Sequence, residues 1–228
     1  MREIVLDTET TGFDPKTGDR IVEIGAVELM RHVATGVTFH EYINPERSMP
    51  DDAFQVHGLG DDFLRDKPKF AAVGQAFLDF VGDSKMIIHN AAFDMKFLNF
   101  ELAKIGLRQL PWEQAVDTLA IARKKFPGSP SSLDALCRRF GINNDARTLH
   151  GALLDSEILA EVYLELIGGK QPDFGLSTRA APKVGEVSTE WTPRPRPTPL
   201  PSRLTEKENA AHAEFVGKLG GGAVWLKS

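Results

Sequence analysis

Apolar and polar residues alternate in three short stretches near the beginning of the chain. The stretches cover residues 3–7, 20–28 and 36–43, are rich in β-branched residues, and are bounded by Gly, Pro, Asp or Asn. A period of two is typical of strands that bury one face, and these boundary residues are typical of turns. The beginning of the chain therefore predicts a meander of antiparallel strands.

From residue 70 onward the spacing of apolar residues changes to that of helices. Two helical faces are marked by Phe70, Val73, Phe77 and Val81 and by Phe93, Phe97 and Phe100. Further elements are expected as short strands at 85–89 and 116–118 and as helices near 119–126, 132–140 and 152–167. The order βββαβαβα predicts an α/β fold, in which helices flank a mixed five-stranded sheet.

The character of the chain changes after about Gly175. Residues 172–205 contain 7 of the 14 prolines and have hardly any apolar periodicity. Such a segment favours extended polyproline II conformation and cannot join a sheet, so it predicts a flexible linker. Residues 205–219 then have a helical pattern, and an apolar end follows three glycines. A segment of about 24 residues is too small to fold alone, so it either stays disordered or docks on a partner.

These patterns divide the chain into a globular domain at 1–169, a Pro-rich linker at 170–204 and a tail at 205–228. No stretch approaches a membrane span of about 20 apolar residues, and the first residues have neither the basic region nor the apolar region of a signal peptide. We therefore expect a cytoplasmic protein with no membrane segment. Its single cysteine, Cys137, excludes an internal disulfide and a thiolate metal cluster, and it is interpreted as a small buried residue.

The net charge of −5 is unevenly distributed. Residues 177–228 carry 8 Lys and Arg against 5 Asp and Glu, a charge of +3, which leaves −8 on residues 1–176. A protein that binds nucleic acid tightly on its own usually has a basic surface, because affinity comes largely from neutralised phosphates. The acidic body therefore argues against an autonomous DNA-binding module. To handle nucleic acid it needs metal ions, local basic groups or a partner that delivers the strand.

Asp7 and Glu9 stand two residues apart at the end of an apolar strand. Residues at this spacing point to the same side of a sheet, so both carboxylates face one site. A solvated strand end is the ordinary interpretation of such a pair. Here the apolar residues 4–6 precede it, and charge in such surroundings is costly unless it binds a cation.

Two more aspartates occupy informative positions in the predicted elements. Asp94 lies where a strand turns into a helix, with Asn90 as the expected N-cap. An aspartate that interacts with the helix dipole from the first turn is the alternative. Asp155 lies on or beside the apolar stripe of the helix at 152–167, where a carboxylate needs a specific partner.

Carboxylates from three distant segments together suit an all-oxygen site for Mg²⁺ or Mn²⁺, which are hard cations. Two such ions can cleave a phosphodiester, because one generates hydroxide from water and the other stabilises the leaving oxygen. His150 is the candidate to accept the proton of the water, since a loop imidazole with a pKa of about 6.5 suits a general base. A surface or helix-end residue is the alternative, and it is favoured for His32, His40 and His212.

The chain resembles the DEDD exonuclease superfamily, in its histidine-bearing branch. Three motifs occur in order: Asp7–Gly12 reads DTETTG, His89–Asp94 reads HNAAFD, and His150–Asp155 reads HGALLD. The resemblance covers residues 1–169, and three motifs together are far more specific than one. It implies a ribonuclease-H-like fold, His150 as the general base, and two divalent metal ions held by Asp7, Glu9, Asp94 and Asp155.

In this superfamily a segment ahead of the second motif lines the nucleotide pocket, and residues 53–59 resemble it. The resemblance implies that Thr10, Asp52 and His57 contact the terminal nucleotide. A plain loop residue is the alternative for His57. The carboxylates implied to contact the substrate as well are Asp7, Glu9 and Asp155.

Within the superfamily, the chain resembles the epsilon proofreading subunits of bacterial DNA polymerase III. Stand-alone nucleases do not need a Pro-rich tether with an apolar end. The resemblance implies that residues 205–228 bind the polymerase alpha subunit and that the substrate is a single-stranded or frayed DNA 3′ end. Gln171–Leu176 resembles a sliding-clamp binding motif, for which plain linker composition is the open alternative.

These features predict a 3′→5′ exodeoxyribonuclease that removes mispaired nucleotides during replication and releases nucleoside 5′-monophosphates. A tether fits the acidic body, because a linker supplies a high effective concentration near the primer end. Two alternatives stay open. One is a stand-alone exoribonuclease, because the motifs do not distinguish a nuclease that acts on RNA from one that acts on DNA. The other is an inactive binding scaffold, which the complete set of catalytic residue types disfavours.

Overall fold

The computed structural model describes residues 1–145, 149–168 and 204–219. It divides into two units, one with every element from the first strand to the helix that ends at Ile167, and one with the helix Glu206–Leu219. The expected clamp-binding segment at 171–176, most of the linker and the apolar end of the chain lie outside the described residues. Among the residues described, every helix is too short or too polar to cross a bilayer.

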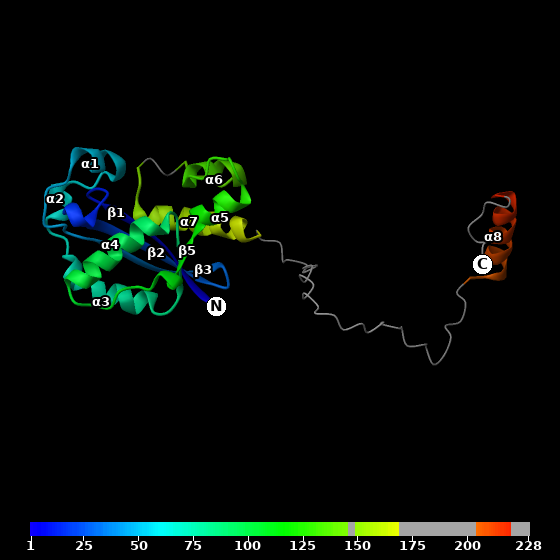
Figure 1. Cartoon of the computed structure of the whole chain (residues 1–228), viewed down its shortest axis with the longest axis horizontal. Helices are drawn as coiled ribbons and strands as arrows, with labels where there is room; N and C mark the ends of the chain where they lie inside the picture. Colours follow the sequence, from blue (N-terminus) through cyan, green and yellow to red (C-terminus); the bar gives the residue numbers. More distant parts are fainter. Residues whose placement is uncertain (146–148, 169–203, 220–228) are drawn as a thin grey trace, which may run out of the picture. The chain divides into compact units, whose positions relative to one another are not determined.

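A mixed five-stranded sheet forms the centre of the first unit (Figure 1). Its strands lie in the order β3-β2-β1-β4-β5. Its strands are β1 (Arg2–Thr10), β2 (Ile21–Met30), β3 (Val33–Tyr42), β4 (Lys85–Ile88) and β5 (Ala115–Asp117). The first three strands pair antiparallel, whereas β4 pairs parallel with both β1 and β5. The predicted α/β fold with a mixed five-stranded sheet is confirmed.

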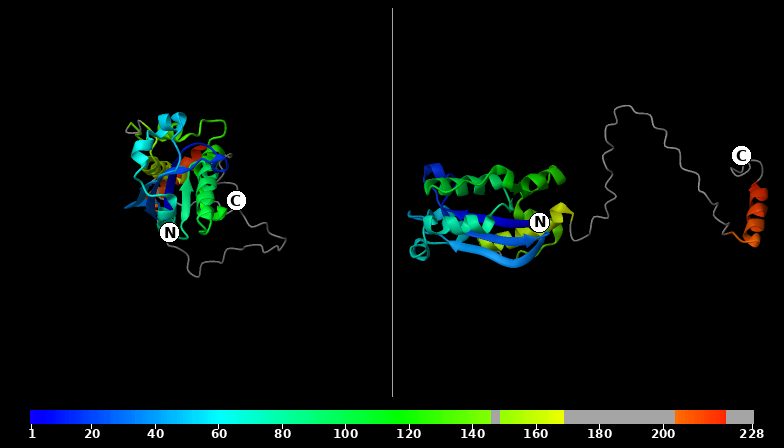
Figure 2. Two further views of the ribbon diagram at one scale, coloured as in Figure 1. Left: turned by 90° about the vertical axis from the view of Figure 1, so that its left-hand side faces the viewer. Right: turned by 90° about the horizontal axis from the view of Figure 1, so that it is seen from below.

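Helices lie on both sides of this sheet (Figure 2). They are α1 (Asp51–His57), α2 (Asp61–Leu64), α3 (Phe70–Val81), α4 (Ala91–Lys104), α5 (Thr118–Lys125), α6 (Leu133–Phe140) and α7 (Ala152–Ile167), with 3-10 turns at Pro15–Thr17 and Trp112–Gln114. One face of the sheet packs with α3 and α4 in a core that includes Phe77 and Phe97. The other face packs with α6 and α7 in a second core that includes Val5, Cys137 and Val162. Cys137 is buried, as expected.

The third strand begins earlier than the alternation predicts, at Val33 rather than Gly36. It follows β2 through a two-residue turn, in which Arg31 and His32 have φ angles of 53° and 66°. Turns of this kind match the twist of a hairpin, and they usually contain Asn or Gly because φ is positive. Arg and His at these positions give no such signal, so the sequence does not predict the turn.

The apolar spacing also does not predict α1 and α2. Both helices are short, and α1 exposes 46% of Phe54 and 44% of Val56. Neither therefore has the apolar stripe of a helix with one buried face. His57 is the last residue of α1 and is buried, so it does not lie in a loop.

The second unit contains α8 (Glu206–Leu219), and this helix confirms the helical pattern at 205–219. Its Phe215 is 57% exposed and its Leu219 is 48% exposed. A helix with large apolar side chains in water has surface available for a partner.

Candidate active site

A cavity of about 600 Å³ lies at the end of β1. All the residues expected to carry the chemistry line it, namely Asp7, Glu9, Asp94, His150 and Asp155. They come from β1, from the first turn of α4, and from the beginning of α7 with the residues before it. The fold therefore gathers the polar residues of all three motifs around one space.

The pairing of β1 with β2 sets the position of the two β1 carboxylates. Asp7 is opposite Gly25 and Glu9 is opposite Glu23. Glu9 is only 8% exposed, which makes its charge costly unless a cation or hydrogen bonds compensate. The register shifts directly after Glu9, and such bulges are common beside active sites.

Helix α7 rests directly on β2 at Gly25. A Cβ atom at this position would lie 2.1 Å from the backbone nitrogen of Leu153. The buried hydroxyl of Ser156 donates to the Gly25 carbonyl oxygen at 2.9 Å and fixes the contact. A residue without a side chain opposite Asp7 therefore allows α7 to bring Asp155 close to the sheet.

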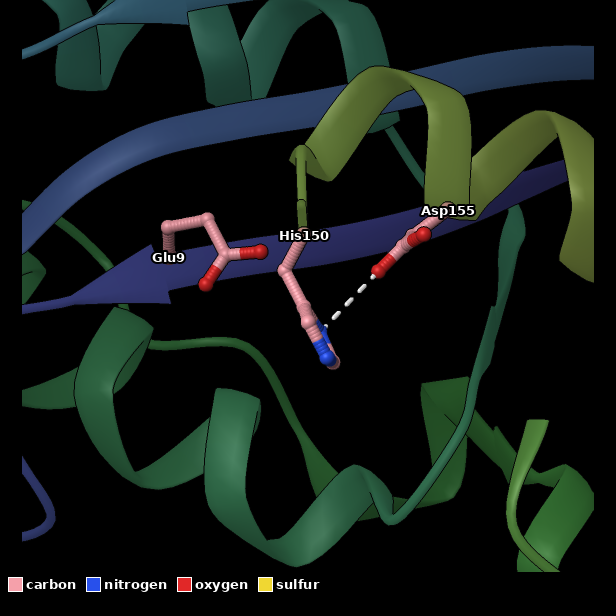
Figure 3. Close-up of side chains that lie close together, drawn as sticks. All are labelled: Glu9, His150 and Asp155. Atoms are coloured by element: carbon pink, nitrogen blue, oxygen red, sulfur yellow. Dashed lines mark ion pairs between the residues drawn. The ribbon is translucent and has the colours of Figure 1, made fainter. Parts of the chain in front are cut away.

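Glu9, His150 and Asp155 converge in this cavity (Figure 3). Among the residues described, one donor atom of each lies within 4.8 Å of the others. His150 Nδ1 is 3.4 Å from Asp155 Oδ2. The side chain of His150 is 48% exposed whereas Asp155 is buried, and His150 lies in the segment before α7, as expected. An imidazole that reaches both solvent and buried carboxylates can take a proton from water.

Asp94 is the most deeply buried of the candidate metal ligands, at 2% exposed. The Thr8 hydroxyl donates to its Oδ1 at 2.7 Å, and Asp94 forms no ion pair within the described residues. Burial raises the pKa of Asp94 to about 7, although the hydrogen bond from Thr8 favours the ionised form. A cation beside this carboxylate would compensate for the solvation lost on burial.

The turn before α4 differs from the expected N-cap. Asn90 occupies the N-cap position with φ 67° and ψ 52°, and its side chain makes no capping hydrogen bond. Its backbone N–H donates instead to Asp117 Oδ1 at 3.2 Å. Asn tolerates this left-handed conformation better than most residues, so Asn90 serves the turn that leads to Asp94.

A second cavity, of about 520 Å³, shares part of its lining with the first. The residues common to both are Thr8, Glu9, Phe13 and Phe93. Phe13 is 83% exposed, and its only signal in the sequence is its position directly after the first motif. The helical spacing explains Phe93 as an apolar packing residue and does not predict that it also borders the two cavities.

The residues expected to contact a nucleotide, Thr10, Asp52 and His57, all line this second cavity. His57 Nδ1 accepts the backbone N–H of Leu59 at 3.1 Å, whereas the buried Nε2 has no hydrogen-bond partner among the described residues. Burial lowers the pKa of His57, although a backbone contact with Thr10 opposes the shift, so the neutral ring is favoured. Since Nδ1 accepts a hydrogen bond, the proton of a neutral ring lies on Nε2. A buried donor in this state suits an acceptor on a ligand.

One backbone hydrogen bond connects the two cavities. The N–H of His150 donates to the carbonyl oxygen of Val56 at 3.0 Å. Val56 precedes His57 in α1. The candidate base and the wall of the second cavity are therefore held together directly.

Comparison with known proteins is consistent with this geometry. The RNase T family model, described as Exonuclease, matches residues 4–163. The chain belongs to this exonuclease family. The match spans all three motifs and every candidate metal ligand of the exonuclease.

Relatives that match over nearly the whole chain narrow the family to which the exonuclease belongs. DNA polymerase III subunit epsilon of Rickettsia felis is 47% identical, over 96% of this chain and 97% of that protein. The subunit epsilon of Escherichia coli is 43% identical, over 98% of this chain and 97% of that protein. Within the exonucleases, the chain therefore belongs to the DNA polymerase III epsilon family, as its motifs and tail predict.

Solved structures confirm the fold of the exonuclease. Exonuclease X in complex with 5′ overhanging duplex DNA has a TM-score of 0.57 and 25% identity, and covers 72% of this chain and 90% of that chain. The nuclease domain of 3′hExo, a DEDDh family member bound to rAMP, has a TM-score of 0.62 and 21% identity, and covers 73% of this chain and 91% of that chain. The expected ribonuclease-H-like fold is therefore confirmed.

The exonuclease family uses divalent metal ions, and the residues of the first cavity fit them. The four candidate carboxylates and the imidazole of His150 line this cavity together with Asp134 and His89, and carboxylates and imidazoles are the ligands that hard and borderline cations prefer. Asp94 in particular is buried with no ion pair among the described residues. The site therefore has the donor atoms for a cation, and a cation would add to the compensation that the hydrogen bond from Thr8 gives the buried Asp94.

Proposed function

We propose that this exonuclease is the proofreading subunit of a bacterial DNA polymerase III. It removes mispaired nucleotides from the 3′ end of DNA and releases nucleoside 5′-monophosphates. The observation that carries the proposal is the convergence of Glu9, His150 and Asp155 in a cavity also lined by Asp7 and Asp94, in a member of the epsilon family.

The proposed roles follow from the positions of the side chains. Two cations, Mg²⁺ or Mn²⁺, are held by Asp7, Glu9, Asp94 and Asp155. When bound, they supply the positive charge that activates water and stabilises the leaving oxygen. His150 accepts the proton of the attacking water. Asp155 lies beside its Nδ1, where a carboxylate stabilises the imidazolium, and Nε2 is assigned as the acceptor.

The second cavity is assigned to the terminal nucleotide. His57 Nε2 donates a hydrogen bond to it, and Thr10 and Asp52 contact it from the same cavity. Phe13 and Phe93 provide aromatic surface for a base where the two cavities meet. Asp7, Glu9 and Asp155 are assigned to its phosphate, which they contact through the cations that they hold. A paired terminus is held by the opposite strand, so a frayed end enters more readily.

The tail is assigned to the polymerase. Residues 205–228 bind the alpha subunit, and the exposed Phe215 and Leu219 of α8 offer apolar contacts for it. Attachment to the polymerase places the exonuclease with the replication machinery in the cytoplasm. It also compensates for the weak intrinsic affinity of an acidic domain for DNA.

We also assign Gln171–Leu176 to the sliding clamp, as a glutamine, Gln171, followed by two apolar anchors, Phe174 and Leu176. Replacing Gln171 and Phe174 by alanine is expected to weaken binding of the full chain to the purified clamp at least about tenfold, as expected for loss of a hot spot. The dissociation constant is measured by titrating each variant onto surface-immobilised clamp. Equal affinity of wild type and the double variant would leave linker composition as the explanation of the pattern.

The function is tested by degradation of a mismatched DNA primer, a paired primer and an RNA strand in Mg²⁺. We expect mononucleotides to be released fastest from the mismatched DNA end. Asp7→Ala is expected to abolish release, and His150→Ala to reduce kcat by about 100-fold to 10,000-fold, the range typical of a lost general base. His212→Ala in α8 is the matched control.

The other outcomes discriminate between the alternatives. A preference for RNA would identify an exoribonuclease. Absence of cleavage with Mg²⁺ and with Mn²⁺ would identify a binding scaffold. Activity that persists in Asp7→Ala would contradict the assigned metal site.

A further inference from the structure

We propose that Arg123 of α5 binds a phosphate of the DNA strand upstream of the bond that is cleaved. The ligand is a phosphodiester, and the role of the side chain is to position the strand. The inference rests on the proposed function, because it requires a strand whose terminal nucleotide lies at the catalytic carboxylates.

Arg123 lines the first cavity together with those carboxylates. Leu119 lines it too, so positions one helical turn apart give α5 a face toward the cavity. Of the residues described along this lining, Arg123 is the only lysine or arginine. Any cation that the chain itself offers to a strand in this cavity therefore comes from Arg123 or from the protonated form of a histidine.

Arg123 is also available for a ligand. It is exposed, and it makes no hydrogen bond or ion pair within the part of the chain that the structure describes. Two nearby cations, Lys125 and Arg139, are by contrast used internally. Lys125 Nζ donates to the Leu166 carbonyl oxygen at 2.9 Å, and the guanidinium carbon of Arg139 lies 4.3 Å from the centre of the Phe126 ring.

The start of α5 is firmly attached to the catalytic part of the fold. Asp117 caps the helix by accepting the backbone N–H of Leu119 at 2.9 Å. Thr118 is fully buried, its hydroxyl donates to the Ile88 carbonyl oxygen at 3.2 Å, and its oxygen lies 2.9 Å from His89 Nδ1. Arg123 therefore extends from a helix anchored to the end of β4, where the second motif begins.

The arrangement of the cavities indicates which phosphate Arg123 meets. The second cavity takes the terminal nucleotide, and the first cavity extends past the carboxylates to Leu119, Arg123 and the residues from Ser132 to Asp134. The preceding nucleotide therefore lies toward α5. The phosphate of this preceding nucleotide is not the one that the catalytic cations hold. It must be accommodated by a domain whose residues 1–176 carry a net charge of −8. A guanidinium binds such a phosphate through two charge-assisted hydrogen bonds.

The test compares two substrates with the full chain in Mn²⁺. A single-stranded DNA oligonucleotide has upstream phosphates, whereas the p-nitrophenyl ester of thymidine 5′-monophosphate has only the phosphate that is attacked. We measure kcat/KM on both for wild type, Arg123→Ala, Arg123→Lys and the matched control Lys124→Ala. Lys124 is the adjacent exposed cation and does not line the cavity.

We expect Arg123→Ala to lower the ratio of oligonucleotide to ester kcat/KM about tenfold, mainly through KM, and Arg123→Lys to lower it less. The slope of log KM against log salt concentration should fall by about 0.7, the value for one phosphate contact on a single strand. Lys124→Ala should keep the wild-type ratio. A neutral methylphosphonate at the upstream linkage should impair wild type and have little effect on Arg123→Ala.

Equal ratios in Arg123→Ala and Lys124→Ala would overturn the proposal. A parallel loss on both substrates would also overturn it, because it would show that Arg123 supports the catalytic centre or the fold. If wild type hydrolyses the ester and cleaves no DNA, the assigned substrate is wrong, and the proposal fails with it. If wild type hydrolyses neither substrate, the proposed function itself fails.

Discussion

Gly25→Ala is expected to lower kcat at least about 100-fold, because displacement of catalytic groups by about 1 Å has effects of this size. The added methyl group would overlap the backbone of α7 at Leu153, and backbone atoms cannot move away as a flexible side chain can. Helix α7 must therefore shift away from β2. That shift carries Asp155 and His150 away from the β1 carboxylates, although neither residue is altered.

The measurement is kcat with the p-nitrophenyl ester, together with a Mn²⁺ titration. Gly151→Ala is the matched control, because a methyl group at that position has no atom within 4 Å and the residue is also next to the site. Ser156→Ala should have a smaller effect, since it removes one buried hydrogen bond worth about 1 kcal/mol. A Gly25→Ala protein with wild-type kcat and metal affinity would show that α7 does not depend on this contact.

Asp94→Asn is expected to abolish nuclease activity and yet to stabilise the metal-free protein. The pKa of Asp94 is raised from 3.8 to about 7, mainly by burial, so ionisation is disfavoured in the folded state. Each pKa unit corresponds to about 1.4 kcal/mol. Below the unfolded pKa the group is protonated in both states. As the pH rises from about 4 to 7, the carboxyl group ionises in the unfolded protein but stays protonated in the folded protein. Folding must then take up a proton, so the free energy of unfolding falls.

The prediction is checked by urea unfolding of the metal-free proteins between pH 4 and pH 8. At pH 8 the free energy of unfolding of Asp94→Asn should exceed that of wild type by at least about 2 kcal/mol, and at pH 4 the two should nearly coincide. Added Mn²⁺ should stabilise wild type and have much less effect on the variant. Asp83→Asn, at an exposed carboxylate, is the control. A lower stability of Asp94→Asn at pH 8 would contradict this account.

Much of the fold can be predicted from the sequence because its main elements have regular apolar spacing. The strands around Val5 and Val27 are short apolar, β-branched stretches bounded by polar and turn residues, and α3 repeats its apolar residues at helical intervals. The candidate catalytic residues are also visible in advance, because charge beside apolar runs is conspicuous. Asp7 after residues 4–6 and Asp155 on an apolar helix both stand out for this reason.

The remaining features depend on contacts between segments that are distant in the sequence. Gly25 resembles any glycine in a strand until α7 is seen against it. Arg123 resembles an ordinary exposed cation in the last turn of a helix, and only the cavity shows that it faces the carboxylates. Asn90 looks like a helix cap, yet the backbone requires its left-handed conformation. None of these roles leaves a periodic signal.

The hydrogen bond from the His150 backbone to Val56 has a consequence for the timing of hydrolysis. His150 lies outside α7, and this bond attaches it to the helix whose last residue is His57. We therefore expect a displacement of α1 to be passed on to His150 through this hydrogen bond. If the second cavity takes the terminal nucleotide and His150 is the general base, as proposed, we expect recognition of that nucleotide to be mechanically coupled to the alignment of the imidazole.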